Sequence, residues 1–416
     1  MGEDRTHAVR SDRDVFVAEN RGQRRRVGRT VYDLEEGDKP TALLTAGGAF
    51  DDVQRVGSGT FGTVFKAKAR ATGDAVALKM QNPGANGFNG GQAAHTGIGE
   101  SALRELRALQ AFPDHPNVVS LQAAFEHRVR GAFFVMQLEY CGHNLYDLIH
   151  DEWVNACFAA SEIKCLVHQL LTGLAAMHER QTMHRDLKPC NLLYSDKGLL
   201  KIADLGSARR TPAVVAGNEP LTPVVTSLYY RAPEVLLGAP YGPEIDVWAA
   251  GLIMGELLLG KPLLPGQTDT EMLRRMVKVF GTPSSATWPG VEALDGFAGV
   301  ANFPPGPNRL REAFPDLSPD AFDLMDRMLT YDPKKRITAR EALEHEYFRT
   351  DPLPMPIDAM PTFPEAVLQQ RRDRKRQEKK RAAERGEARG PKFGTTELGL
   401  LRGPKKAKKV ARGGIF

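Results

Sequence analysis

The fold and the chemistry of this chain are decided by His184-Arg185-Asp186-Leu187-Lys188-Pro189-Cys190-Asn191, followed at Asp204-Leu205-Gly206 by a second acidic turn. Together they supply two carboxylates, a lysine and an amide, which are the groups that phosphoryl transfer asks of a protein. In such a reaction Asp186 would accept the proton of a substrate hydroxyl, and Lys188 would neutralise charge on the group in transfer. Asn191 and Asp204 would hold magnesium through hard oxygen atoms.

A glycine-rich segment upstream, Gly57-Ser58-Gly59-Thr60-Phe61-Gly62-Thr63-Val64, lies between two expected strands. Glycines let backbone N–H groups approach phosphates that a Cβ would obstruct. Taken alone the segment is equally typical of a hairpin turn, and a dinucleotide-binding loop is disfavoured because a strand follows it instead of a helix. Lys79 comes next along the chain, and Glu105 on the following expected helix offers it a carboxylate. An ion pair between Lys79 and Glu105 would hold the lysine against nucleotide phosphates.

Each of these residues also has a structural explanation. Asp186, Asn191 and Asp204 are residue types common in turns, and a single lysine on a strand is usually a surface group. His184 is expected to be a hydrogen-bonded core residue and not an acid or base. The order of glycine loop, lysine, glutamate and acidic turns is what favours a phosphoryl-transfer site over chance.

The composition is that of a soluble globular protein with polar ends. The chain has 416 residues, of which 42% are hydrophobic and 26% charged, which is enough for one large core. No secretory signal or membrane span is expected, because the first residues are polar and the most apolar run, residues 247–259, is short and contains Glu256. The cysteines lack zinc-site spacing and are interpreted as reduced thiols.

The pattern of apolar residues predicts strands first and helices after. Residues 82–99 are rich in Gly and Asn and are expected to form a loop. This order predicts an α+β protein of two lobes, a small antiparallel β-rich lobe at residues 52–140 and a larger, mainly helical lobe at residues 141–348. Strands are expected at residues 53–56, 63–67, 75–79 and 133–140, and helices at residues 100–112 and 161–179.

Both ends of the chain are expected to lie outside this folded body. Residues 1–51 are polar and lack apolar periodicity, which predicts a disordered extension. Prolines cluster at residues 352–364 and cannot propagate a helix, so residues 349–416 are expected to form a Pro-rich exit and a largely disordered basic tail. Residues 367–416 carry 17 Lys or Arg and 5 Asp or Glu, a net +12. Because the whole chain has a net charge of +5, the remainder carries −7.

Later motifs complete a pattern that resembles eukaryotic protein kinases over residues 52–348. Ala232-Pro233-Glu234 and Asp246-Val247-Trp248 follow in order, and Glu234 is expected to form a buried ion pair with Arg336. Within that family the chain resembles cyclin-dependent kinases, on Ser101-Ala102-Leu103-Arg104-Glu105, on residues 222–231 and on Gly281-Thr282-Pro283-Ser284. The similarity is greatest to the branch of cyclin-dependent kinases ten and eleven, called PITSLRE kinases, because of residues 344–348 and 352–364.

The resemblance implies a serine/threonine kinase that uses ATP and Mg2+. It assigns catalysis to Asp186 and Lys188, and magnesium to Asn191 and Asp204, as the roles of the corresponding residues are known in the family. Adenine is expected at the hinge around residues 139–141. The implied nucleotide-binding residues are Val56, Gly57, Ser58, Gly59, Thr60, Phe61, Gly62, Val64, Ala77, Lys79, Glu105, Leu138, Glu139 and Cys141.

The resemblance also implies a switch. Thr222 aligns with the phosphosite that an upstream activating kinase modifies, and Arg104, Arg185 and Arg209 align with the cluster that receives the phosphate. Binding of a cyclin, an L-type cyclin being one candidate, would move Glu105 toward Lys79. The substrates would be proteins phosphorylated on Ser or Thr before proline.

Two other functions compete with this interpretation. A kinase-fold scaffold without activity is disfavoured by the intact set of polar residues, and it would stay silent with every cyclin. An RNA-binding protein acting through the basic tail is also considered, but a solvated charge run is commoner, and no nucleic-acid binding is claimed. Residues 405–409 resemble a nuclear import signal, so we expect a nuclear protein, with the cytoplasm as a second location, in transcription, RNA processing or cell-cycle control.

Overall fold

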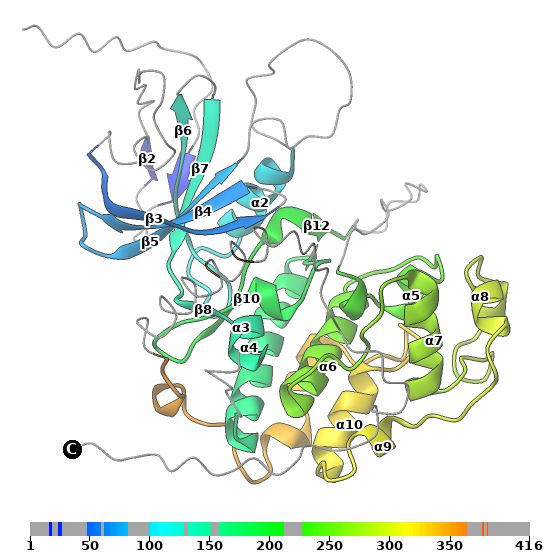
Figure 1. The fold of residues 1–416 in the computed structure, drawn as a ribbon. Helices are drawn as coiled ribbons and strands as arrows, with labels where there is room; N and C mark the ends of the chain where they lie inside the picture. The colour runs from blue at the N-terminus through cyan, green and yellow to red at the C-terminus, as the bar shows by residue number, and fades with distance from the viewer. Residues whose placement is uncertain are drawn as a thin grey trace, which may run out of the picture. The chain divides into compact units, whose positions relative to one another are not determined.

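The computed structural model describes residues 16–18, 24–26, 48–59, 62–81, 100–128, 132–150, 158–211 and 227–363, with Gln377 and Arg381. The chain divides into two compact units. Unit 1 contains residues 1–145, 172–195 and 199–218, and unit 2 contains residues 146–171, 196–198 and 219–416. The large sheet belongs to unit 1, and the series of helices from α5 onward belongs to unit 2 (Figure 1).

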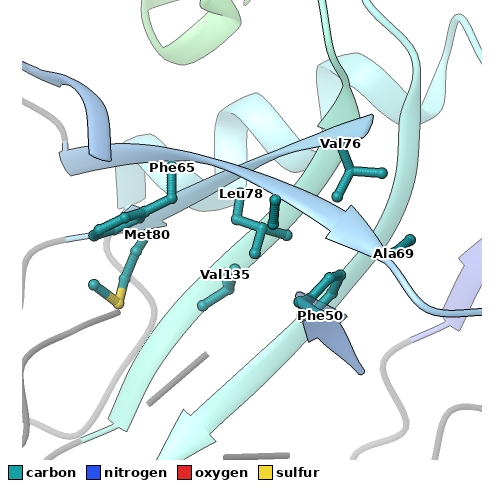
Figure 2. Packing of buried hydrophobic residues seen from close by; sticks show 8 residues of the cluster. Phe50, Phe65, Ala69, Val76, Leu78, Met80 and Val135 are labelled. Carbon is teal, nitrogen blue, oxygen red and sulfur yellow. The ribbon is translucent and has the colours of Figure 1, made fainter. Parts of the chain in front are cut away.

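Unit 1 is built on a five-stranded antiparallel sheet. Alternate residues of two central strands, such as Phe65 and Leu78, are buried on one face and form a compact core (Figure 2). Lys79 stands between the core residues Leu78 and Met80, so it points to the opposite face of the sheet. In sheet order the strands are β3 (Phe50–Gly59), β4 (Gly62–Ala69), β5 (Ala75–Gln81), β7 (Ala132–Glu139) and β6 (Leu121–Arg128).

Three of the four predicted strands lie inside observed strands, and the fourth, at residues 133–140, runs one residue past the end of β7. The sequence missed β6. Its sequence, LQAAFEHR, mixes alanine with charged residues and has no clean alternation of apolar and polar positions. Residues 1–51, which were expected to be mostly disordered, contain two short strands among the residues that the structure describes. Strands β1 (Phe16–Ala18) and β2 (Arg24–Arg26) pair antiparallel, and β3 begins at Phe50. Strands of three residues are too short for a period of two to be recognised.

Several short elements of unit 1 carry the acidic turns. Strands β8 (His143–Asn144), β10 (Leu192–Tyr194) and β11 (Leu200–Ile202) form one antiparallel sheet. Strands β9 (Thr182–Met183) and β12 (Arg209–Arg210) form a second pair. Between them lie the 3-10 turns η1 (Pro189–Asn191) and η2 (Leu205–Ser207), which fix the backbone next to Asn191 and Asp204.

Helix α2 (Glu100–Gln110) belongs to unit 1 and carries Glu105. The predicted helix at residues 100–112 is confirmed to within two residues. Ala102, Leu106 and Leu109 are buried, at the helical spacing that the sequence shows, and Glu105 is buried with them at 1% exposure. A carboxylate placed on the buried face of an amphipathic helix needs a partner.

Unit 2 is mainly helical, with α6 (Glu244–Leu259) at its centre. This helix is apolar around its whole circumference and almost all of its residues are buried, which identifies a core helix. No helix among the described residues is long and apolar enough to cross a membrane. Unit 2 also contains most of α3 (Leu145–His150) and the part of α4 (Ala160–Glu179) that ends at Leu171. The remaining elements are η3 (Leu228–Tyr230), α5 (Pro233–Leu236), α7 (Asp269–Phe280), η4 (Val291–Ala293), α8 (Phe297–Ala301), α9 (Leu310–Ala313), α10 (Pro319–Met328), α11 (Ala339–Leu343), η5 (Glu346–Phe348) and η6 (Ile357–Ala359).

The proline cluster does not mark an exit from the folded body, as the sequence analysis expected. Residues 349–363 continue as a strap on unit 2: Met355 N–H donates to the Ser161 carbonyl at 2.9 Å, and Met360 is only 4% exposed. Phe363 meets Phe158 edge-on, with ring centroids 6.3 Å apart. Proline prevents a helix, but it is compatible with an extended segment whose other side chains pack.

The predicted ion pair between Glu234 and Arg336 is present. Two guanidinium nitrogens of Arg336 lie 2.6 Å and 2.9 Å from the two carboxylate oxygens of Glu234, and both side chains are fully buried. Because neither charge can reach water, removing one partner leaves the other uncompensated.

Glu234→Gln is expected to lower the free energy of unfolding by roughly 3–5 kcal/mol, the cost of leaving one buried charge unpaired. Equilibrium denaturation in urea measures this loss. The matched control is Arg70→Ala, which removes a pair with Asp51 whose side chains are 53% and 45% exposed; this variant should unfold almost like the wild type, because solvent-exposed pairs contribute little. Equal losses in both variants would contradict this account of the buried pair.

Candidate active site

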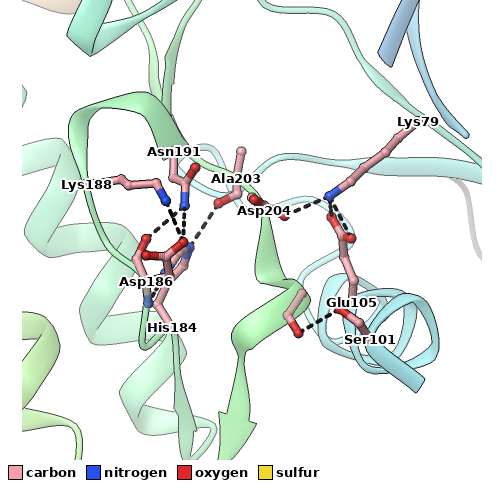
Figure 3. A network of polar contacts seen from close by, with 10 residues as sticks. Lys79, Ser101, Glu105, His184, Asp186, Lys188, Asn191, Ala203 and Asp204 are labelled. Carbon is pink, nitrogen blue, oxygen red and sulfur yellow. Dashed lines mark hydrogen bonds and ion pairs between the residues drawn. The ribbon is translucent and has the colours of Figure 1, made fainter. Parts of the chain in front are cut away.

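A buried lysine holds two carboxylates in unit 1. The Nζ of Lys79 lies 2.7 Å and 2.8 Å from the two carboxylate oxygens of Glu105, and 2.7 Å from Oδ1 of Asp204 (Figure 3). The predicted ion pair of Lys79 with Glu105 is therefore present. Asp204 lies 125 residues further along the chain than Lys79. Its contact with Lys79 joins the five-stranded sheet to the second acidic turn.

The electrostatics of this cluster favour a charged lysine. Burial lowers the pKa of Lys79, but the negative charges of Glu105 and Asp204 outweigh burial and leave this pKa raised. Burial likewise raises the pKa of Asp204, yet attraction to Lys79 is stronger and the pKa falls below its usual value. Burial raises the pKa of Glu105, and Lys79 offsets only part of that effect. One ammonium thus faces two carboxylates, an arrangement that a further cation would balance.

Contacts between α2 and η2 position Asp204. The backbone of Asp204 has φ 60° and ψ 63°, in the left-handed region, which aspartate tolerates better than most residues. Ser101 Oγ on α2 donates to the Gly206 carbonyl at 3.2 Å. A Cβ on Gly206 would lie 3.1 Å from that same Oγ, so glycine allows the close approach of helix and turn.

The first acidic turn forms a compact hydrogen-bonded group. Asp186 Oδ2 accepts from Lys188 Nζ at 2.7 Å and from Asn191 Nδ2 at 3.3 Å (Figure 3). Asn191 Nδ2 also donates to the Asp186 carbonyl at 2.8 Å. Asp186 is buried, at 6% exposure of the whole residue. The two donors fix the direction of its carboxylate. Such an acceptor can take a hydrogen bond, and then a proton, from an incoming hydroxyl.

His184 links the two acidic turns, and its predicted structural role is supported. The ring is fully buried. Its Nε2 lies 2.9 Å from the Ala203 carbonyl, next to Asp204, and its Nδ1 accepts from Asp186 N–H at 3.2 Å. With one ring nitrogen facing each turn, the histidine holds Asp186 and Asp204 in a fixed relation.

The donor set fits magnesium. Because Asn191 uses its amide nitrogen toward Asp186, its side-chain oxygen is directed the other way. Asp204 contacts Lys79 through Oδ1, so Oδ2 is the oxygen that it would offer to a metal. Magnesium in proteins is commonly held by one or two such oxygens together with nucleotide phosphates and water. Asn191 and Asp204 are therefore the residues that would hold it.

The predicted nucleotide-binding residues fall on neighbouring strands of one sheet. Val64 pairs directly with Lys79 across β4 and β5, and Ala77 pairs with Leu138 across β5 and β7. Because paired residues share a face, these four side chains lie on the face opposite the core of Figure 2. A nucleotide on this face would meet aliphatic side chains beside the ammonium of Lys79.

The glycine-rich segment is described in part. Val56 and Gly57 are partly buried in β3, and the backbone of Ser58 and Gly59 completes that strand, while Thr60 and Phe61 lie outside the described residues. A Cβ on Gly62 would overlap the Met80 carbonyl oxygen. Gly62 is thus needed for close pairing of β4 with β5, whether or not a phosphate binds nearby.

The end of β7 is fixed by an ion pair with Lys201, a residue that the sequence analysis did not assign. Glu139 accepts from Ser120 N–H at 2.7 Å and pairs with Lys201 Nζ at 2.8 Å. Cys141 follows β7 and is partly buried. The sequence signal for this pair was Lys201, a lysine within the short buried strand Leu200–Ile202, because a buried cation requires a partner.

The residues of the predicted switch are placed in part. Thr222 lies outside the described residues. Arg104 is exposed on α2, Arg185 Nε donates to the Ser207 carbonyl at 2.8 Å, and Arg209 stands opposite Met183 in the β9–β12 pair. All three arginines belong to unit 1.

The chain is similar to known proteins. Residues 50–348 match the protein kinase domain family. Probable cyclin-dependent kinase 10 of Dictyostelium discoideum is 39% identical over 318 residues, covering 76% of this chain and 83% of that protein. Cyclin-dependent kinase 20 of Mus musculus is 41% identical over 316 residues, covering 74% and 87%. Cyclin-dependent kinase G-1 of Oryza sativa subsp. indica is 40% identical over 336 residues, covering 78% of this chain but only 46% of that longer protein.

A solved structure is similar over the same region. It is a chain of the CAK complex from Chaetomium thermophilum bound to ATP-gamma-S, with a TM-score of 0.67 and 32% sequence identity. The match covers 77% of this chain and 98% of that one. The three curated relatives carry different branch names at nearly equal identity, so they identify the larger group and leave the branch open.

Proposed function

The chain belongs to the protein kinase family, within the cyclin-dependent kinases, and we propose that a cyclin controls its transfer of phosphate from ATP to serine or threonine of protein substrates. The predicted α+β kinase fold and the serine/threonine kinase class are confirmed by these matches. The fold implies that the enzyme uses ATP. The proposal concerns the residue roles, the metal, the partner and the substrates.

The observation that carries the proposal is the contact of Lys79 Nζ with both Glu105 and Asp204. It places a cation, held by a helix, beside a carboxylate suited to a metal. In this proposal Lys79 binds nucleotide phosphates, and Glu105 keeps it in place. Burying Glu105 on α2 without Lys79 as its partner would be unfavourable. A scaffold without activity would have no use for such a buried pair.

In the proposed mechanism each residue has one task. Asp186 orients the substrate hydroxyl and accepts its proton, and Lys188, 2.7 Å from Asp186 Oδ2, offsets negative charge there. Magnesium, when bound by Asn191 and Asp204, would neutralise charge on the phosphates. His184 keeps both acidic turns in register. Little covalent work remains, so positioning and charge supply the catalysis.

Helix α2 supports control by a cyclin. Its buried Glu105 reaches Lys79, whereas Arg104 and Arg107 on the same helix are exposed. A partner that binds the outer face of α2 would stabilise the position in which the Glu105 pair forms. The names of the relatives describe cyclin-dependent enzymes, and an L-type cyclin remains one candidate for this chain.

Thr222→Ala is expected to lower the activity of the cyclin-bound enzyme by at least roughly tenfold, since the family resemblance implies that a phosphate on Thr222 forms charge-assisted hydrogen bonds with Arg104, Arg185 and Arg209. Initial rates after treatment with an activating kinase measure the effect. Thr72→Ala, in the exposed turn after β4, is the control and should remain fully active. Undiminished activity of the Thr222 variant would remove the switch.

The finer features of the proposal come from the sequence. Proline after the target residue is proposed from the resemblance of residues 222–231 to the activation segment of the family, although Thr226 stands where the family usually has Val. The nucleus is proposed from residues 405–409, and a role in transcription, RNA processing or cell-cycle control from the branch it resembles.

The test is an assay of phosphate transfer from labelled ATP to paired Ser-Pro and Ser-Ala peptides. The full chain is assayed alone and with each member of a panel of purified cyclins. We expect activity with at least one cyclin and a preference for the Ser-Pro peptide. Silence with every cyclin, while the chain is folded and binds nucleotide, would instead support a scaffold.

A further inference from the structure

A fully buried carboxylate of unit 2 joins three segments of the chain. Glu256 on α6 has no exposed side-chain surface. Its Oε1 lies 2.6 Å from Nε2 of His150 on α3, and its Oε2 accepts from the Tyr230 hydroxyl at 2.6 Å. Tyr230 ends η3, which follows residues 222–226 in the chain after a single residue. Glu256 therefore ties both α3 and η3 to the central helix of unit 2.

The two donors cannot replace each other. A buried carboxylate is tolerated when its oxygens are hydrogen-bonded, and here each oxygen has one donor of its own. We therefore assign the proton of the imidazole to Nε2, the nitrogen that faces the carboxylate oxygen. Loss of that donor would leave Oε1 unsatisfied at a position without solvent access. The carboxylate would then rotate toward another partner, and this rotation would shift the hydroxyl of Tyr230.

Tyr230 lies in the segment that the proposed function assigns to substrate binding. Residues 222–231 resemble the activation segment, and this inference rests on that assignment. The neighbouring Arg231 anchors the same segment through Asp269 at 2.7 Å, but Asp269 is 59% exposed. An ion pair so open to solvent contributes little. The buried contact of Tyr230 with Glu256 therefore constrains the backbone here more strongly than the pair of Arg231 with Asp269 does.

We propose that His150 is a positioning residue for the protein substrate. By donating its Nε2 proton to Glu256, it fixes the carboxylate that holds Tyr230, and so the surface on which the substrate peptide binds. His150 itself has no contact with the substrate in this proposal. Its side chain is 19% exposed and lies beside the ring of Tyr146, with centroids 4.5 Å apart, which keeps the imidazole directed at Glu256.

The test uses the full chain with the cyclin that activates it in the panel above. His150→Ala should raise the KM for a Ser-Pro peptide roughly tenfold, as expected for loss of one hydrogen bond to a buried charge. The kcat and the KM for ATP should change less than about twofold, because the change does not reach the nucleotide. His150→Gln, whose amide keeps an N–H donor, should restore most of the peptide KM.

Two further variants separate positioning from general stability. Tyr230→Phe removes only the hydroxyl and should also raise the peptide KM, and the double variant His150→Ala/Tyr230→Phe should be little worse than the stronger single one, because both act through one carboxylate. His345→Ala is the matched control: it removes a histidine paired with Asp323 at 2.8 Å elsewhere in unit 2, and it should leave the peptide KM unchanged.

Several results would overturn the proposal. These are an unchanged peptide KM in His150→Ala, additive effects in the double variant, or changes of similar size in kcat and in both KM values that follow the loss of thermal stability. If His150→Ala fails to fold, Tyr230→Phe and His150→Gln decide, since unchanged peptide binding in the former or failed rescue in the latter contradicts it. Direct binding of a labelled peptide gives the same comparison without turnover, so an inactive wild-type enzyme would count against the proposed function separately.

Discussion

Asp186→Asn is expected to reduce phosphate transfer by roughly 10²–10⁴-fold, the contribution of a positioned general base, while nucleotide binding stays nearly unchanged. Asparagine has almost the same size and can still meet Lys188 and Asn191, so the turn should keep its shape. It cannot take a proton from the substrate hydroxyl. The loss should appear in kcat for the peptide, because the base acts in the transition state.

Two measurements check the Asp186→Asn prediction: steady-state kinetics with the activating cyclin, and the Kd of a fluorescent ATP analogue. Asp196→Asn is the control, because Asp196 is an exposed turn residue, and this variant should match the wild type in both. Wild-type turnover by Asp186→Asn would show that another group accepts the proton. A large loss of nucleotide affinity would instead assign Asp186 to binding.

Glu105→Gln should lower kcat/KM by about 10²–10³-fold, which corresponds to the roughly 3–4 kcal/mol expected when a buried ion pair loses one charge. Lys79 would remain with Asp204 as its only carboxylate among the contacts described. The ammonium would then be drawn toward the metal-binding carboxylate and away from the nucleotide phosphates. This effect differs from that of Asp186→Asn, because the KM for ATP should rise together with the fall in kcat.

The measurement for Glu105→Gln is the dependence of initial rate on ATP concentration, with thermal unfolding recorded in parallel. Glu344→Gln, an exposed residue of unit 2, makes the same chemical change and should have no effect. Full activity of Glu105→Gln would mean that the pair with Lys79 has no part in the reaction. A loss shared by the control would point to damage of the fold.

Local patterns in the sequence predicted what local forces decide. The alternation of Phe65, Ala67, Val76 and Leu78 predicted two strands because these side chains form one side of the core. The spacing of α2 was visible for the same reason. Strand β6 was missed, since its place in the sheet depends on pairing with β7 and its own residues show no alternation. The strap at residues 349–363 was missed because proline shows what a segment cannot form and not what it packs against.

The candidate site was predicted less by pattern than by resemblance. The order of motifs predicted the pair of Lys79 with Glu105, which the structure contains. It did not predict the bond of Lys79 with Asp204 or the pairing of Glu139 with Lys201, because contacts between distant segments are set by tertiary packing. His150, in contrast, belongs to no motif, and only the burial of Glu256 draws attention to it.

The central claim is that Asn191 and Asp204 hold divalent metal beside nucleotide phosphates bound by Lys79. Crystals grown with a nonhydrolysable ATP analogue and manganese test it most directly, by anomalous diffraction at the manganese edge. The account predicts an anomalous peak within bonding distance of oxygens from both Asn191 and Asp204. A bound nucleotide with no peak beside either residue would contradict it.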